Sequence, residues 1–323
     1  MTPEEEKTKV LIEEIRAIAD QENILILAHN YQPPEVYEIA DLIGDSLELA
    51  ISARKSTADT ILFCGVDFMA DTAKILSPDT RVLIPDPDAR CTMAQMAGEE
   101  ALKRLKQKIP DATVVSYVNT TTATKVCTDI CCTSANAIEI VESCESEKVI
   151  FLPDRNLAAY ASRFTRKEII PAEGFCYVHD AITKESVTSM QRLHPESVFI
   201  AHPECRPAII DLAEAVCSTS GMIRYCQDSG ASSFIIGTES GMLHRLRQDI
   251  PGKKFYSVAG VCAPMKRVTL KKVRDCLQSG SGEIHLEKEL MDAARRPLER
   301  MIEISKGTQS RSCRTREEIR KVL

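Results

Sequence analysis

Ile24-Leu25-Ile26-Leu27 begins the stretch that decides the fold, because two similar stretches follow it, Thr113-Val114-Val115-Ser116 and Ser197-Val198-Phe199-Ile200. Each apolar stretch runs into a polar pair, and the pairs are His29 with Tyr31, Tyr117 with Asn119, and His202 with Glu204. Each copy ends in one cysteine, and Cys91, Cys176 and Cys262 are separated by 85 and 86 positions (176 minus 91 and 262 minus 176). A fixed period of this kind indicates an internal repeat.

Apolar strands alternate with amphipathic helices in each copy, which is the pattern of parallel α/β units. We therefore expect an α/β fold of three pseudo-threefold-related αβα lobes, with short parallel sheets around a central active site. The expected lobes are 1–108, which includes an N-terminal helix, 109–193, and 194–323, which includes C-terminal helices and a tail. Each lobe is expected to have three strands, and long helices are predicted at 37–56, 132–143 and 206–217. The polar segment 306–323 is expected to be mobile.

Composition and charge narrow the function classes. The chain has 323 residues, 44% hydrophobic and 27% charged, with a net charge of −6, so it lacks the basic footprint of a nucleic-acid-binding protein. A small acidic substrate remains compatible, because local cations and amides bind anions within an acidic protein. The sequence begins with an acidic helix start rather than an apolar signal, and no apolar run is long enough to span a bilayer. We therefore expect a cytoplasmic location.

The chain has thirteen cysteines. In a reducing compartment these are expected to be buried residues, ligands or nucleophiles rather than disulfides. Cys91, Cys176 and Cys262 stand out because each occupies the same place in its repeat. Three thiolates from three lobes are one fewer than a [4Fe–4S] cluster usually takes, which leaves one iron open to a reactant. The alternative is that duplication alone made three buried cysteines equivalent. Cys127, Cys131 and Cys132 are interpreted as structural.

Polar groups at strand ends provide the candidate chemistry, since ligands of parallel sheets bind beyond the carboxyl ends of the strands. Glu204 can supply a carboxylate base beside the His202 imidazole, and the phenols of Tyr31 and Tyr117 can donate or accept a proton. The alternative is that these strand-end groups are structural. The histidine would then be held by ordinary hydrogen bonds, the glutamate would face solvent, and the tyrosines would lie at an interface. His179 is expected just outside the cluster's ligands. A hydroxyl also recurs in each copy near a helix end, where it can bind an anion or cap the helix. These hydroxyls belong to Ser46, Ser134 and Ser218 with Thr219.

Taken together, the motifs resemble the quinolinate synthase family from about residue 22 to 305. The matching motifs include Ala28-His29-Asn30-Tyr31-Gln32, Gly44-Asp45-Ser46-Leu47, Cys91-Thr92-Met93-Ala94, Tyr117-Val118-Asn119, Thr133-Ser134-Ala135-Asn136, Gly174-Phe175-Cys176-Tyr177-Val178-His179, His202-Pro203-Glu204-Cys205, Ser218-Thr219-Ser220 and Cys262-Ala263-Pro264-Met265-Lys266. Asp71 stands where the family pattern has Glu, and Met265 replaces a cysteine that some members carry after the last ligand. The second departure removes a thiol switch at that place and leaves the expected ligands intact.

The resemblance implies condensation of iminoaspartate with dihydroxyacetone phosphate to quinolinate, phosphate and water in NAD biosynthesis. It implies a [4Fe–4S] cluster with one open iron, held by Cys91, Cys176 and Cys262. It also implies transient contact with an enzyme that produces iminoaspartate. By this resemblance, the groups that hold carboxylates or phosphate are His29, Ser46, Ser134, His202, Ser218 and Thr219. The groups around the reacting carbons are Tyr31, Tyr117, Asn119 and Glu204, and of these the resemblance makes Glu204 and Tyr31 the candidates for proton transfer.

Two other functions remain open from the sequence. The first is an aconitase-like iron–sulfur hydro-lyase, which would share the open iron but release no phosphate. The second is a non-catalytic iron–sulfur sensor, which the acidic charge and the missing DNA-binding signature disfavour.

Overall fold

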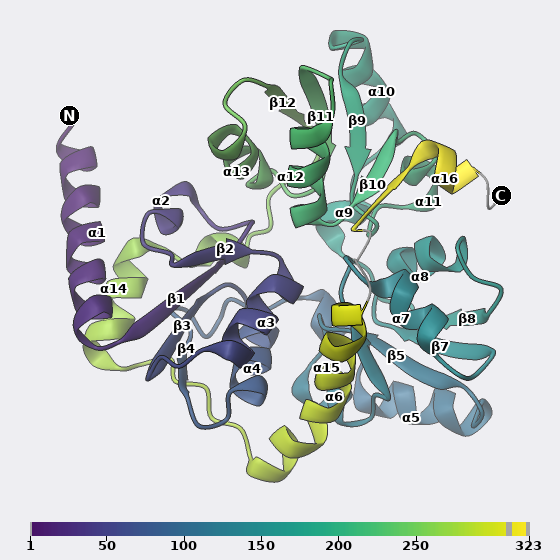
Figure 1. Cartoon of the computed structure of the whole chain (residues 1–323), viewed down its shortest axis with the longest axis horizontal. Coiled ribbons are helices and arrows are strands. Elements are labelled where there is room, and N and C mark those ends of the chain that lie inside the picture. The colour runs from purple at the N-terminus through teal and green to yellow at the C-terminus, as the bar shows by residue number, and fades with distance from the viewer. Residues whose placement is uncertain (1, 308–311, 321–323) are drawn as a thin grey trace. The chain divides into compact units, whose positions relative to one another are not determined.

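A computed structural model describes residues 2–307 and 312–320, and its helices and strands are labelled in Figure 1. The fold is α/β, as expected, with three separate sheets flanked by helices (Figure 1). The chain divides into two compact units. The first contains the residues up to Cys91 together with Cys262–Arg295, and the second contains Thr92–Val261 together with the residues from Arg296 onward.

The first unit contains one four-stranded parallel sheet in the order β2-β1-β3-β4. Its strands are β1 (Ile24–His29), β2 (Leu42–Gly44), β3 (Thr60–Cys64) and β4 (Arg81–Leu83). Its helices are α1 (Pro3–Gln21), α2 (Pro34–Tyr37), α3 (Ser46–Lys55), α4 (Asp67–Leu76), the short 3₁₀ turn η2 (Met265–Arg267) and α14 (Leu270–Ser279).

The second unit contains the other two sheets. One has the order β6-β5-β7-β8, with strands β5 (Thr113–Tyr117), β6 (Ile130–Cys132), β7 (Lys148–Leu152) and β8 (Glu168–Pro171). The other has the order β12-β11-β9-β10-β13, with strands β9 (Val198–Ala201), β10 (Ala215–Cys217), β11 (Ser233–Gly237), β12 (Lys254–Ser257) and β13 (Cys313–Thr315).

Helices connect these strands. They are η1 (Met93–Gln95), α5 (Glu99–Lys108), α6 (Thr122–Val126), α7 (Ala137–Ser143), α8 (Arg155–Ser162), α9 (Tyr177–Asp180), α10 (Lys184–Leu193), α11 (Pro207–Ile210), α12 (Thr219–Asp228), α13 (Met242–Asp249) and α16 (Arg316–Arg320). The helix α15 (Lys288–Gly307) contains the boundary between the two units. No helix among the described residues has both the length and the apolar character needed to cross a membrane.

The three sheets repeat one strand order, in which the first strand of each copy lies between the second and the third. The sequence predicted only three strands a copy, and this was wrong. The missing strands are β2, β6 and β10. β2 and β10 fall inside the helices expected at 37–56 and 206–217, and β6 ends where the helix expected at 132–143 begins. Each is only three residues long, so its period-2 pattern is too short to outweigh the helical pattern around it.

The sheet of the first unit is covered on one face by α1 and α14, which lie side by side (Figure 1). A capping box starts α1, because the Thr2 hydroxyl accepts from the Glu5 amide at 3.2 Å and the Glu5 carboxylate accepts from the Thr2 amide at 2.7 Å. Ile15 of α1, Ile26 of β1 and Val273 of α14 share one fully buried cluster. Burial of each such side chain contributes about 1.5–3 kcal/mol, so packing of this face fixes the sheet.

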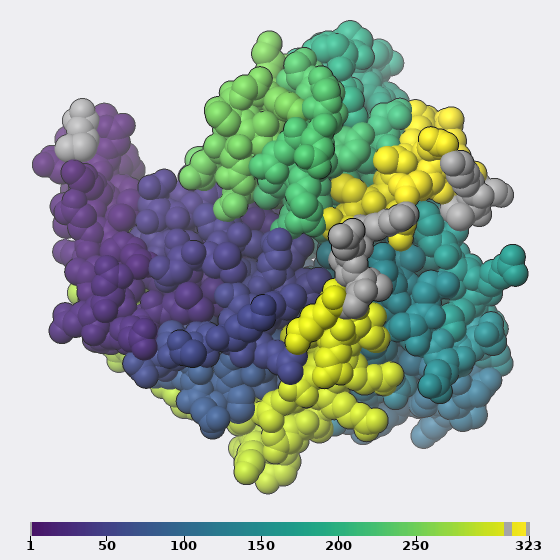
Figure 2. Space-filling model, viewed as in Figure 1, coloured from purple at the N-terminus to yellow at the C-terminus, as the bar shows by residue number. Residues whose placement is uncertain are grey.

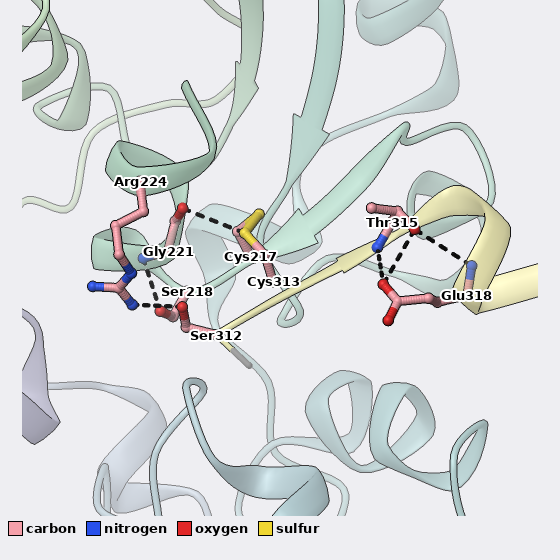
Figure 3. Close-up of a disulfide and its surroundings, with 8 residues drawn as sticks. All are labelled: Cys217, Ser218, Gly221, Arg224, Ser312, Cys313, Thr315 and Glu318. Carbon is pink, nitrogen blue, oxygen red and sulfur yellow. Dashed lines mark hydrogen bonds between the residues drawn. A yellow bond between two sulfur atoms is a disulfide. The ribbon is translucent and has the colours of Figure 1, made fainter. Parts of the chain in front are cut away.

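The prediction that the segment 306–323 is mobile was wrong for those of its residues that the structure describes. Cys313–Thr315 forms β13, which pairs antiparallel with β10, and α16 follows it. The space-filling view shows this segment, in yellow, at the molecular surface (Figure 2). Residues 308–311 and 321–323 lie outside the described residues. The expectation of no disulfides was also wrong, because Cys217 of β10 and Cys313 of β13 are disulfide-bonded (Figure 3).

Candidate active site

In the first unit, His29 and Tyr31 lie at the carboxyl end of β1. His29 pairs in register with Gly44 of β2, so the loop that carries Ser46 begins beside it. The Tyr31 amide donates to Nδ1 of His29 at 3.1 Å, and the two rings pack edge to face with centroids 4.6 Å apart. An Nδ1 that accepts a hydrogen bond places the proton of the neutral imidazole on Nε2. Nε2 of His29 is therefore the atom that can donate to a ligand.

The second unit repeats this arrangement at the end of β9. The Glu204 amide donates to Nδ1 of His202 at 3.4 Å, as Tyr31 does to His29 two copies earlier. Both histidines are buried. A histidine followed two residues later by an amide donor is therefore a repeated device that fixes the tautomer. The sequence indicated this arrangement, because His29 and Tyr31, like His202 and Glu204, are two positions apart.

Glu204 lies at the centre of a buried network in the second unit. Its Oε2 is 2.6 Å from Nδ1 of His179 and 3.7 Å from Nδ1 of His202. The two imidazoles stack with centroids 4.5 Å apart, and Nε2 of His179 hydrogen-bonds the Thr238 hydroxyl at 2.8 Å. The Tyr117 side chain also hydrogen-bonds the Glu204 carboxyl group. Residues from β5, α9, β9 and the end of β11 thus converge on one carboxylate.

The network keeps Glu204 ionised. Burial opposes ionisation, but the electrostatic effect of the neighbouring His179 and His202 imidazoles and the hydrogen bonds from His179 and Tyr117 outweigh it and lower the pKa of Glu204 to about 2. Asp154 behaves in the opposite way, because burial and the Glu204 charge raise its pKa well above the ordinary value. Glu204 is therefore the carboxylate that is ready to accept a proton, and Asp154 is the carboxyl group that neutralises first.

The candidate hydroxyl residues differ in whether they cap a helix. Ser218 caps α12, because its hydroxyl accepts from the Gly221 amide at 3.2 Å, and Thr219 is the first residue of that helix. Asp45, rather than Ser46, caps α3 through the Leu47 and Glu48 amides. Helix capping therefore accounts for Ser218 but not for Ser46.

Ser134 and Ser218 line the same cavity in the second unit. It has a volume of about 10 Å³, and Tyr160, Pro203 and Ser312 also contribute to its wall.

Asn119 follows β5, and its Oδ1 is buried with no hydrogen-bond partner among the described residues. A buried acceptor left unpaired is costly, so this atom is suited to a ligand that donates to it.

Two carboxylates that the sequence reasoning missed hold the cysteine loops. Oδ1 of Asp67 accepts from the Cys91 amide at 3.1 Å and from the Phe68 amide at 2.9 Å. Oδ2 of Asp154 accepts from the Cys176 amide at 3.1 Å, while its Oδ1 caps α8 through the Leu157 amide at 2.7 Å. Each carboxylate anchors the loop of one repeat cysteine to the helix that follows the third strand.

The sequence carried a signal for these carboxylates. Asp67, Asp154 and Glu239 follow the third strand of each copy and are 87 and 85 positions apart (154 minus 67 and 239 minus 154). The three acidic residues share the period of the cysteines. A search for repeated acids as well as repeated cysteines would have found them.

The segment after Cys262 is fixed to the first unit by polar contacts. The Gln32 side chain donates to the Met265 carbonyl at 3.1 Å, and the Lys266 ammonium donates to the Tyr31 carbonyl. Asp86, which follows β4, binds Arg267 at 3.0 Å and Lys272 at 2.5 Å. These pairs tie the Cys262 segment to the turn that carries Tyr31 and to the loop that leads to Cys91.

Exposure separates the three repeat cysteines from most others. Cys91, Cys176 and Cys262 are outside any disulfide and partly exposed, as is Cys127. The other free cysteines are buried, and burial raises the pKa, for example to about 12 for Cys131 and about 11 for Cys144. A thiol that stays protonated is a poor metal ligand. Cys131 and Cys132 lie on β6 and are buried.

Cys176 also belongs to a group that can hold a metal. Its sulfur, a His179 nitrogen and a Glu204 oxygen lie within 4.8 Å of one another. The donor types fit a metal cofactor, because thiolates suit iron–sulfur centres and imidazole suits several transition metals.

The predicted site residues divide between the two units. His29, Tyr31, Ser46, Cys91 and Cys262 belong to the first unit. The second unit brings Tyr117, Glu204 and Cys176 close to His179, and Ser134 close to Ser218. That all three cysteines meet at one cluster stays a prediction.

Comparison with known proteins gives a consistent result. The family model described as "Quinolinate synthetase A protein" matches residues 13–303. Quinolinate synthase from Methanoregula boonei is 52% identical over 297 residues, which cover 91% of this chain and 98% of that protein. Quinolinate synthase from Methanosarcina barkeri is 49% identical, with 91% and 97% covered, and that from Geobacter sp. strain M21 is 46% identical, with 92% and 98% covered. These names support the synthase prediction and not the hydro-lyase alternative. The chain belongs to the quinolinate synthase family.

Proposed function

We propose that the chain condenses iminoaspartate with dihydroxyacetone phosphate to form quinolinate, phosphate and water. The observation that carries the proposal is the buried Glu204 side chain, surrounded by Tyr117, His179 and His202, in a chain of this family. Building a pyridine ring from these substrates requires a base for carbon-bound protons and donors for carboxylates and phosphate. The described residues supply both kinds of group.

Glu204 is proposed as the base that removes a proton next to the substrate carbonyl or imine. A carboxylate with a pKa of about 2 is a weak base in water, but it stays unprotonated at neutral pH. Tyr117 donates to this carboxylate and can pass a proton between it and the substrate. His179 orients the carboxylate through its contact at 2.6 Å and is itself held by Thr238. Tyr31 is the second candidate for proton transfer.

Carboxylate and phosphate binding is proposed for the hydroxyl and imidazole groups. Nε2 of His29 carries the proton and can donate to a carboxylate oxygen. The α12 amino end, with Ser218 and Thr219, presents amides and hydroxyls suited to an anion. Ser46, Ser134 and His202 are proposed to act in the same way. Asn119 offers its buried Oδ1 to a substrate hydroxyl or imine N–H.

A [4Fe–4S] cluster held by Cys91, Cys176 and Cys262 is proposed as the metal cofactor. When bound, it would supply a Lewis-acidic iron that binds substrate oxygen atoms and eases loss of water. Support comes from the partial exposure of these three thiols and from the carboxylates that fix the Cys91 and Cys176 loops. The cytoplasmic location and a transient contact with the enzyme that produces iminoaspartate belong to the same proposal.

The test is formation of both products. Protein purified without oxygen should convert dihydroxyacetone phosphate and freshly made iminoaspartate into quinolinate and an equal amount of phosphate. Cys176→Ser should lose bound iron and this activity together. Cys144→Ser is the matched control, because Cys144 is a buried thiol of the same unit that donates to the Ile140 carbonyl at 3.3 Å, a bond that serine can replace. Full activity of iron-free Cys176→Ser would refute the proposal.

A further inference from the structure

The disulfide between Cys217 and Cys313 lies beside the proposed anion-binding residues and joins positions 96 residues apart (Figure 3). Cys217 directly precedes Ser218, and Cys313 directly follows Ser312, which lines the cavity shared by Ser134 and Ser218. We call residues 312–315 the C-terminal strap. We propose that Cys217 and Cys313 are a redox-modification site, at which thiol–disulfide exchange closes and opens this cavity. The inference rests on the proposed function, because it assigns an anion to that cavity.

The strap is seated on the third sheet by backbone pairing. Cys217 lies opposite Cys313 in the antiparallel ladder between β10 and β13. The Ser218 amide donates to the Ser312 carbonyl at 2.9 Å, and the Arg316 amide donates to the Glu214 carbonyl at 2.7 Å. The amide of the capping residue Ser218 is thus occupied by the strap rather than free for a ligand.

Side chains close the remaining space around Ser312. Arg224 of α12 donates to the Ser312 hydroxyl at 2.5 Å (Figure 3). The strap passes so near α12 that a Cβ on Gly221 would collide with the Ser312 carbonyl oxygen. Arg314 pairs at 3.2 Å with Glu139 of α7, another residue of the cavity wall.

The cavity is too small to hold the proposed anion while the disulfide is formed. A volume of about 10 Å³ is near the minimum for one water molecule, so a carboxylate or phosphate group does not fit. With the disulfide formed, the strap therefore occludes Ser134 and Ser218. A ligand that uses these hydroxyls requires the strap to move away from Ser218.

Reduction removes the disulfide that links the strap to β10. A thiolate of a dithiol reductant attacks the Cys313 sulfur, which is the more exposed of the two, and Cys217 leaves as a thiolate. The second thiol of the reductant then resolves the mixed disulfide. Cys313 of the strap and Cys217 of β10 each become a thiol, and the dithiol becomes a disulfide, so two electrons and two protons are transferred. What remains is a three-residue edge strand, whose net hydrogen-bond energy competes with the entropy that the segment regains.

The experiment compares quinolinate binding in the two redox states. The iron-loaded protein is kept without oxygen and is treated with either reduced or oxidised dithiothreitol, and mass spectrometry counts free thiols. Calorimetry with quinolinate should give a Kd at least tenfold lower for the reduced form, the factor expected when the open form falls to about one tenth of the molecules on oxidation. Equal iron content in both states shows that the cluster is not the cause.

Variants separate the strap from other thiols. Cys313→Ser should bind quinolinate as tightly as the reduced protein in both treatments. Cys144→Ser, which leaves the disulfide intact, should keep the tenfold difference. Equal Kd values for oxidised and reduced protein, or free thiols at both Cys217 and Cys313 after oxidation, would overturn the inference.

A second measurement needs no ligand. Trypsin should cut after Arg314 and Arg316 at least tenfold faster in the reduced protein, because the strap must leave the sheet to enter the protease. Equal cleavage rates overturn the redox inference whatever binds in the cavity. Absence of quinolinate binding in both states, with cleavage still redox-dependent, would instead refute the proposed function and support the strap.

Discussion

At the scale of single residues, the chemistry depends on how neighbours set the state of Glu204. Tyr117, His179 and His202 all face this carboxylate, and their combined effect outweighs the cost of burial. A buried carboxylate without such partners would be protonated near neutral pH and unable to act as a base.

Replacing Glu204 with glutamine should remove the base while keeping the shape of the site. We expect kcat for quinolinate formation to fall about 10²- to 10⁴-fold, the usual contribution of general-base catalysis. Bound iron per chain should stay within the range of the wild type. Glu185→Gln, at an exposed position on α10, is the control and should leave kcat unchanged. If Glu204→Gln kept wild-type kcat, the assignment of the base would be wrong.

The candidate site was partly predictable at this scale. The recurring apolar stretches led to His29, Tyr117, His202 and Glu204. Each of these residues lies at or just after the end of the first strand of its own copy. Asp67 and Asp154 were missed, since their roles depend on backbone amides of Cys91 and Cys176 that lie 24 and 22 residues further along the chain. Side-chain contacts across such loops are set by tertiary packing, which a local pattern does not encode.

At the scale of elements, short segments carry the cysteines and are held by charge pairs. Asp86, between β4 and Cys91, binds Arg267 of η2 and Lys272 of α14. Burial opposes ionisation of Asp86, but hydrogen bonds from Lys272 and Arg267 outweigh it and lower its pKa below the ordinary value. This carboxylate thereby links the segments that precede Cys91 and follow Cys262.

Asp86→Asn should therefore destabilise the protein in a pH-dependent way. A carboxyl group whose pKa is lowered by folding stabilises the folded state above its unfolded pKa of about 3.9, and this contribution is lost as the pH falls through the folded value. We expect the free energy of unfolding to drop by about 1–3 kcal/mol at pH 7 and the difference to shrink at pH 3. Urea unfolding of metal-free protein at both pH values measures it, and an equal difference at both would contradict the pKa assignment.

The elements also show where sequence reasoning stops. β1, β5 and β9 begin within one residue of the apolar stretches that predicted them, because each is an apolar run preceded by a turn. The three-residue strands β2 and β10 were merged into predicted helices and β6 was overlooked, although each ends one or two residues before a candidate hydroxyl. β13 was missed because its polar residues, such as Arg314, gain their order from pairing with β10 and Glu139, which are distant in sequence.

At the scale of the whole molecule, the internal repeat explains the common order of the three sheets. Each copy places its first strand beside its second, so the polar residues of both strand ends are neighbours. The repeat was visible in the sequence from the spacing of the cysteines. The redox state of Cys217 and Cys313 was not visible, because a disulfide depends on spatial proximity across 96 residues.

The central claim is that three cysteines, one from each copy, hold a single cluster with one iron left for the reactant. Mössbauer spectroscopy of ⁵⁷Fe-enriched protein, purified without oxygen and recorded with and without quinolinate, tests it most directly. We predict about four iron and four sulfide ions per chain, with one iron of the four changing its signal when quinolinate binds. A cluster whose four irons are all unaffected by quinolinate, or a protein that binds quinolinate and turns over without iron, would contradict the claim.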